Sequence, residues 1–354
     1  MAFVLFKFVH PTKLLILNTV SMQNAFLGSL VGDAIAMPAH WYYDRNALDR
    51  DYGDFDSYLA PRNPHPDSIL WRSKYEPIGP KADILHDQAK FWGKRGVHYH
   101  QFLQAGENTL NLKLSVELYR WIILRGSFDL DEWLARYAEV MLTPGWHHDT
   151  YAEEYHRNFF AHYARGKSLR SCGSADLHIG ALSLIPGLLA GLEALEITDP
   201  ATLIELAVAL VRATHDHEYS LRAATDFTRI LLHVADGVPI RKVLSELPIP
   251  GVSVSKFMNW VDLPDRIVVG EKLSTACYLP ESFVASLYFA WKYHDDFSLA
   301  LLQNAKVGGD NCHRAVVVGA SLGIGCGVPR KWLRDLVSME DLRCDLRTVK
   351  GLSL

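Results

Sequence analysis

Small residues recur at every fourth position in two distant stretches of the 354-residue chain. One stripe is Gly28, Gly32 and Ala36, and the other is Ala315, Gly319 and Gly323. Residues four apart share one face of a helix, and each internal glycine costs about 1 kcal/mol relative to alanine, so a packing gain must offset that cost. We therefore predict that a helix over residues 23–39 crosses, at unusually short range, a second helix that begins near Cys312.

The turn before the second helix is a candidate functional site. Gly308 and Gly309 allow backbone conformations that a side chain would forbid, and Asp310 or Asn311 can cap the helix that follows. The exposed N–H groups at a helix start also favour anions. We expect a ligand or proton-transfer site at this turn, including Asp310, Cys312 and His313.

Most of the remaining chain also reads as helix. After Ser171 the apolar residues follow three-and-four spacing, and neither a βαβ alternation nor a GxGxxG motif is present. Leucines alternate over residues 110–118, but Leu with Glu and Lys favours a helix there, with Asn108, Asn111 and Ser115 in a polar line. Two helices are expected over 128–165, broken at 143–149, and an irregular surface excursion over 238–275. The fold class is all-α.

Composition limits the function classes. Hydrophobic residues make up 49% of the chain and no linker stands out, so we expect one large domain. A net charge of −4 argues against a broad nucleic-acid-binding surface. Five cysteines without CxxC spacing indicate reduced thiols in a cytoplasmic protein. Residues 1–21 hold two apolar bursts too short to span a membrane, and are read as an N-terminal extension.

Two further groups carry open alternatives. The loop-like stretch over 40–100 holds Trp41, Tyr42, Tyr43, Trp71 and Tyr75, which either form a wall for a flat ring such as adenine or pack the loop against itself. The histidines of the loop regions match no zinc signature and are interpreted as loop or core residues; they are His98, His100, His147 and His148.

Several blocks in fixed order resemble the ADP-ribosylglycohydrolases. They are GSLVGDAIAMPAHW at 28–41, ATHDHEYS at 213–220, YLPESFVASLYFAWKYHDDFSLALLQNAKVGGD at 278–310 and GCGVPRKW at 325–332. The resemblance implies a single-domain orthogonal helical bundle over 22–345, followed by a tail at 346–354. It also implies hydrolysis of the bond that joins ADP-ribose to a protein side chain, and a binuclear Mg²⁺ site.

The chain departs from that family at the implied metal ligands. The family's Thr-Asp-Asp-Thr corresponds to residues 106–109, and its Gly-Gly-Asp-x-Asp-Thr to residues 308–313. The implied metal ligands are Glu107, Asn108, Thr109, Asp310, Cys312 and His313. A thiol and an imidazole are poor Mg²⁺ ligands, so the resemblance leaves open Mg²⁺, one ion, a softer ion such as Zn²⁺ or Fe²⁺, or none.

Two functions remain open at this stage. In the first, the protein hydrolyses an ADP-ribose glycoside: Glu107 and Asp310 hold a metal or activate water, while His313 or Asp176 transfers a proton. Asp176 and His178 lie where the family has an arginine. Expected substrate contacts are Asp33, His40, His178, Asn304, Gly308 and Gly309. In the second, the protein binds ADP-ribose or a nucleotide without catalysis. Asp33 has a structural alternative too, which is to cap a neighbouring helix.

Overall fold

The computed structural model describes residues 21–342, and α-helices dominate that part of the chain. No β-strand occurs there, and backbone pairing outside helices is confined to isolated bridges. The all-α prediction is confirmed. The helices are α1 (Met22–Ala36), α2 (Arg45–Tyr52), α3 (Leu110–Arg125), α4 (Leu130–Met141), α5 (Glu154–Ala164), α6 (Ile185–Ala194), α7 (Pro200–Arg212), α8 (Glu218–Ala235), α9 (Ile240–Glu246), α10 (Val254–Trp260), α11 (Asp265–Ile267), α12 (Glu281–Lys292), α13 (Phe297–Val307), α14 (Asn311–Cys326) and α15 (Arg330–Arg334).

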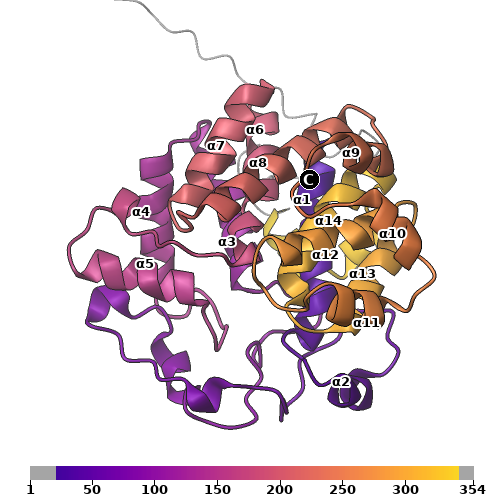
Figure 1. Cartoon of the computed structure of the whole chain (residues 1–354). Helices are drawn as coiled ribbons and strands as arrows, with labels where there is room; N and C mark the ends of the chain where they lie inside the picture. The colour runs from indigo at the N-terminus through magenta and orange to yellow at the C-terminus, as the bar shows by residue number, and fades with distance from the viewer. Residues whose placement is uncertain (1–20, 343–354) are drawn as a thin grey trace, which may run out of the picture.

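Helices α1 and α14 cross at the centre of the molecule (Figure 1). A Cβ atom built on Gly28 would lie 2.1 Å from the carbonyl oxygen of Gly319, and one built on Gly32 would lie 2.6 Å from that of Ala315. Only glycine permits such an approach, because real Cβ atoms do not come this close to backbone atoms. The predicted close crossing of the first and last large helices is therefore confirmed.

The other helices surround this pair. In Figure 1, α3, α4 and α5 lie on one side of α1 and α14, α10, α11 and α13 lie on the other, and the chain after α2 runs along the lower edge. Capping residues begin several of the outer helices: the Asp129 carboxylate accepts hydrogen bonds from the N–H groups of Asp131 and Glu132 at α4, and Asp199 accepts from Thr202 at α7.

Two local predictions are wrong. Residues 238–275 are not an irregular excursion: they form the short helices α9, α10 and α11, and Ile240, Val243 and Phe257 are buried in the core. The runs are too short for a clear helical period, which explains the error. The helix at the candidate site begins at Asn311, but the side chain of Asp310 makes no capping hydrogen bond there.

The aromatic loop mostly packs against itself. Trp41 and Tyr42 are buried; the Trp41 ring stacks on His40 at 3.9 Å between centroids, and Tyr42 contacts the ring of His65 at 4.0 Å. Within residues 21–342, no helix is both long and apolar enough to cross a membrane. Almost all of the expected N-terminal extension, and the whole C-terminal tail, lie outside the described residues.

Candidate active site

The double-glycine turn fixes the position of Asp310. Gly308 and Gly309 both have positive φ, at 75° and 63°. Trp41 N–H donates to the carbonyl of Gly309 (2.8 Å), and Gly309 N–H donates to the carbonyl of Tyr42 (2.7 Å). The N–H of Asp310 donates to the Thr275 carbonyl (2.9 Å). The start of α14 is thus joined to the segment after α1 and to the segment before α12.

A buried arginine reinforces this joint. The Arg314 guanidinium donates to the side-chain oxygen of Asn304 (3.0 Å) and to the carbonyls of Thr275 (3.0 Å) and Gly308 (2.5 Å). The amide of Asn304 in turn donates to the Asn311 carbonyl (2.8 Å). Gly308, Gly309 and Asn304, expected to contact substrate, therefore build the turn that presents Asp310.

Three imidazoles surround the carboxylate of Asp310, which is fully buried. Oδ1 lies 2.5 Å from His313 Nδ1 and 3.0 Å from His40 Nε2, and Oδ2 lies 3.4 Å from His178 Nε2. Burial alone would raise the pKa of Asp310, but the neighbouring His313 and His40 hold that pKa well below its usual value. Asp310 is therefore ionised, and its Oδ2 atom has no hydrogen-bond partner.

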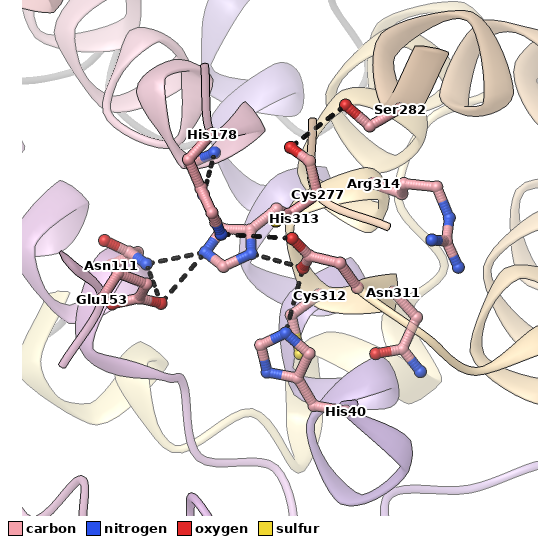
Figure 2. Close-up of polar contacts among 12 residues, drawn as sticks. His40, Asn111, Glu153, His178, Cys277, Ser282, Asn311, Cys312, His313 and Arg314 are labelled. Carbon is pink, nitrogen blue, oxygen red and sulfur yellow. Dashed lines mark hydrogen bonds and ion pairs between the residues drawn. The ribbon is translucent and has the colours of Figure 1, made fainter. Parts of the chain in front are cut away.

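His313 lies between two carboxylates. Figure 2 shows its ring at the centre of the contacts, with Asn111 and Glu153 on one side. Its Nε2 atom is 3.3 Å from Glu153 Oε1 and 2.7 Å from the amide nitrogen of Asn111. Burial lowers the pKa of His313, but Asp310 and Glu153 outweigh burial and raise it to about 10.

A second row of polar groups reaches Asp310 through His40. His40 Nδ1 lies 2.7 Å from His100 Nε2, and His100 Nδ1 contacts the Asp149 carboxylate. All of these groups are buried, and the two rings are stacked nearly parallel. His100 thus belongs to the centre, whereas His98 and His147 bond to backbone carbonyls, as expected for core histidines.

His178 is fixed by the backbone on both sides of it. The backbone N–H of His178 donates to the Asp176 carboxylate (2.8 Å), and the ring Nδ1 of His178 accepts from the backbone N–H of Gly180 (2.9 Å). The segment also pairs with Tyr278 in an isolated antiparallel bridge. Asp176 therefore holds the turn that carries His178. Both His178 and the neighbouring Cys277 are partly exposed, so this is the side of the centre that faces solvent.

The residues expected from the Thr-Asp-Asp-Thr comparison make other contacts than with Asp310. Glu107 accepts from the N–H of Gln104 (2.9 Å). Asp33 accepts from the side-chain amide of Asn108 (2.9 Å), and from the N–H (2.8 Å) and hydroxyl (2.7 Å) of Thr109. Asp33 therefore holds the start of α3, which is the structural alternative for that residue. The Cys312 thiol points to the Asp33 carbonyl (3.8 Å).

The polar residue that α3 contributes to the centre is Asn111, which lies one turn later than the residues singled out by the comparison. Glu153, Asp149 and Cys277 were not predicted either. Glu153 and Asp149 lie near the start of α5, after the histidine-containing loop, and no spacing in the sequence marks them. Glu153 and Asp149 differ from most other acidic residues only in being buried, and the sequence does not show that burial.

Two groups of side chains in residues 21–342 have ligand atoms within 4.8 Å of one another, as a shared metal would require: His40, Asp310 and His313, and His178, Cys277 and Asp310. Neither includes Glu107 or Cys312. Mg²⁺ prefers oxygen ligands, and each group offers one carboxylate among nitrogen and sulfur atoms. The residues brought together here do not fit a binuclear Mg²⁺ site.

The chain belongs to the ADP-ribosylglycohydrolase family, whose sequence model matches residues 21–351. Among known proteins, it is similar to Crystallin J1A of Tripedalia cystophora, with 25% identity over 321 residues that cover 88% of this chain and 90% of the crystallin. Its fold is similar to a solved ADP-ribosylglycohydrolase-related protein complex, with a TM-score of 0.55, 17% identity, and coverage of 94% of this chain and 99% of that one.

Proposed function

We propose that the protein hydrolyses the glycosidic bond of an ADP-ribosylated substrate or a related ADP-ribose glycoside. One observation carries the proposal: Asp310 Oδ2 is a buried carboxylate oxygen with no hydrogen-bond partner, 3.4 Å from His178 Nε2 at the solvent-facing side of the centre. Family membership supports the reaction class.

A water molecule beside this pair, within hydrogen-bond reach of both atoms, would donate a hydrogen bond to Asp310 Oδ2 and accept one from the N–H of His178. Glycoside hydrolysis passes through a transition state with positive charge at the sugar carbon, so it needs a positioned water and nearby negative charge. Asp310 supplies both. As the water attacks the sugar carbon, Asp310 Oδ2 accepts the water proton, and the leaving group departs with the electron pair of the broken glycosidic bond and takes up a proton from solvent. Asp310, whose pKa is held low, then returns its proton to solvent.

His313 has a supporting role in this scheme. Its ring joins Asp310 to Glu153 and keeps the Asp310 carboxylate in one orientation. His40 does the same from the opposite side, through its row to His100 and Asp149. Glu107, which accepts from the N–H of Gln104, has no assigned role in the reaction.

A second function is supported by the crystallin relative. In this case the protein keeps the centre and binds ADP-ribose or a nucleotide without turnover. The two functions differ in one measurement, which is release of free ADP-ribose from ADP-ribosylated arginine and serine peptides and from small ADP-ribose glycosides.

The natural protein should release ADP-ribose from at least one substrate of the panel. Asp310→Asn removes the charge of the carboxylate and should reduce the rate at least ~100-fold, in the range of losses seen when a catalytic electrostatic group is removed. Asp295→Asn, an exposed residue, is the matched control and should keep the natural rate. Thermal stabilisation by ADP-ribose without turnover of any substrate would favour the binding function instead.

A further inference from the structure

We propose that imidazole N–H groups take the place of a divalent cation at Asp310, so that the centre is built to work without a metal. The inference concerns the same centre as the proposed function and deepens it, but it is argued from hydrogen-bond donors and can be tested without any activity.

A backbone contact determines which ring nitrogen of His178 carries the proton. A neutral imidazole carries its proton on one nitrogen and accepts with the other. Because Nδ1 of His178 accepts a hydrogen bond from the backbone N–H of Gly180 (2.9 Å), the proton of the neutral ring is on Nε2. Nε2 is the atom that faces Asp310 Oδ2. It therefore presents an N–H donor to the carboxylate rather than a lone pair to a metal, and the group formed with Cys277 loses its nitrogen ligand.

The group formed by His40, Asp310 and His313 has two ligand atoms too close together for a shared ion. Two ligand atoms held at 2.0–2.1 Å from one tetrahedral ion are about 3.3 Å apart. His313 Nδ1 and Asp310 Oδ1 are 2.5 Å apart, which is closer than the spacing of two metal ligands and below even the about 2.7–2.9 Å of a charged N–H···O hydrogen bond. The contact is filled by a proton on Nδ1, and an ion would have to force the two atoms apart within a buried, close-packed site.

His40 is oriented by the hydrogen-bonded residues His100 and Asp149. The contacts from Asp149 to His100, from His100 to His40 and from His40 to Asp310 each need one proton. They are satisfied in one direction when His40 Nε2–H donates to Asp310 and His40 Nδ1 accepts from His100 Nε2–H. His100 then donates through both nitrogens, as an imidazolium paired with the buried Asp149 carboxylate. His313 and His40 then donate N–H groups to Oδ1 of one carboxylate, and the N–H of His178 faces its unpartnered Oδ2 at 3.4 Å.

Elemental analysis of the full-length protein, purified without chelator from medium containing Mg²⁺, Mn²⁺ and Zn²⁺, tests the inference directly. We expect far less than one ion per chain, no difference between the natural protein and Asp310→Asn, and no change in melting temperature on adding EDTA or any of the three ions. One ion per chain that is lost in Asp310→Asn would overturn the inference.

Long-range ¹H–¹⁵N NMR of histidine-labelled protein reports which ring nitrogen of each histidine carries the proton. The main result is obtained on the natural protein, so it does not depend on a variant that folds. We expect neutral rings with the proton on Nε2 for His178 and His40, and a protonated Nδ1 in His313, all unchanged by Zn²⁺. Substitution of each ring by Asn assigns the signals, and His148→Asn, on an exposed loop, is the matched control. A His178 ring protonated on Nδ1 would refute the proposal.

The outcomes separate this inference from the proposed function. A metal-free protein with no hydrolase activity would uphold the inference and reject the function. Hydrolysis that stops in EDTA and returns with one stoichiometric ion would uphold the function and reject the inference.

Discussion

Replacing Gly319 with alanine should test the crossing of α1 and α14 that holds the centre together. The new Cβ would lie 2.1 Å from the carbonyl oxygen of Gly28 and 2.8 Å from its carbonyl carbon. Both are backbone atoms, so no side chain can rotate away, and the two helices must move apart by roughly 1 Å to reach an acceptable contact of about 3 Å.

The magnitude follows from two opposing effects. Overpacking of this kind costs about 1–3 kcal/mol, and a gap of up to 1 Å forfeits up to half of the dispersion energy of the contacts it separates, so we take about 3 kcal/mol. Alanine is the better helix former by about 1 kcal/mol. The Gly319→Ala variant should therefore lose about 2 kcal/mol of unfolding free energy.

Gly325→Ala is the matched control, because Gly325 lies in the same helix and its added Cβ would meet nothing nearer than a Val234 methyl group at 3.7 Å. It should gain up to about 1 kcal/mol, less any fraying of the helix end. Urea unfolding followed by circular dichroism measures both variants. Equal stabilities for the two would refute the reasoning, since helix propensity alone would then account for both.

The other predictions concern the groups that support the centre. Arg314→Lys replaces three hydrogen bonds by at most one or two and should cost about 2–4 kcal/mol in urea unfolding, whereas an unchanged midpoint would show that the guanidinium is dispensable. Asp33→Asn keeps only one of the two oxygens that accept from Thr109 and should cost about 2–3 kcal/mol by the same assay, with the loss absent if α3 is held by packing alone. Burial lowers the pKa of His65 and of His156 to about 4, so below pH ~6.5 the unfolded chain takes up protons that the folded chain does not. The free energy of unfolding should therefore fall as pH drops from ~6.5 towards ~4, by about 1.4 kcal/mol per pH unit for each ring. Urea unfolding at pH 7, 6 and 5 measures this, and a flat profile would contradict it.

The sequence was sufficient for the fold because its strongest signals are local. The four-residue spacing of small residues identified both central helices and their contact, and a pair of glycines before Asp310 identified the turn. Short helices without a full apolar period, such as α9 and α10, were missed for the converse reason. Propensity and periodicity describe neighbours in sequence, and these signals are weak in segments of seven residues.

The site could be predicted less completely from the sequence than the fold, because its residues are brought together by tertiary contacts. His40 and Asp310 were recognisable as polar residues in matched blocks, and His178 and His313 as polar residues where the chain departs from the family. Glu153 and the row to Asp149 were not, since nothing in their spacing links them to residue 310. The resemblance to Thr-Asp-Asp-Thr predicts Glu107 as a site residue, while the structure places Asn111 next to His313.

Taken one at a time, the departures at residues 312–313, and Asp176 and His178 in place of the family's arginine, each read as the loss of a group that the family retains. In the structure, His40, His178 and His313 come from three distant segments and direct ring nitrogens at the same buried carboxylate. An ionised Asp310 without such partners would be unstable in this environment, because an isolated buried charge is costly. The three imidazoles supply this compensation at Asp310 from residues of the chain itself. Decay of an unused site would not produce three donors aimed at one carboxylate, and this convergence is the physical reason for expecting a centre that still has a function.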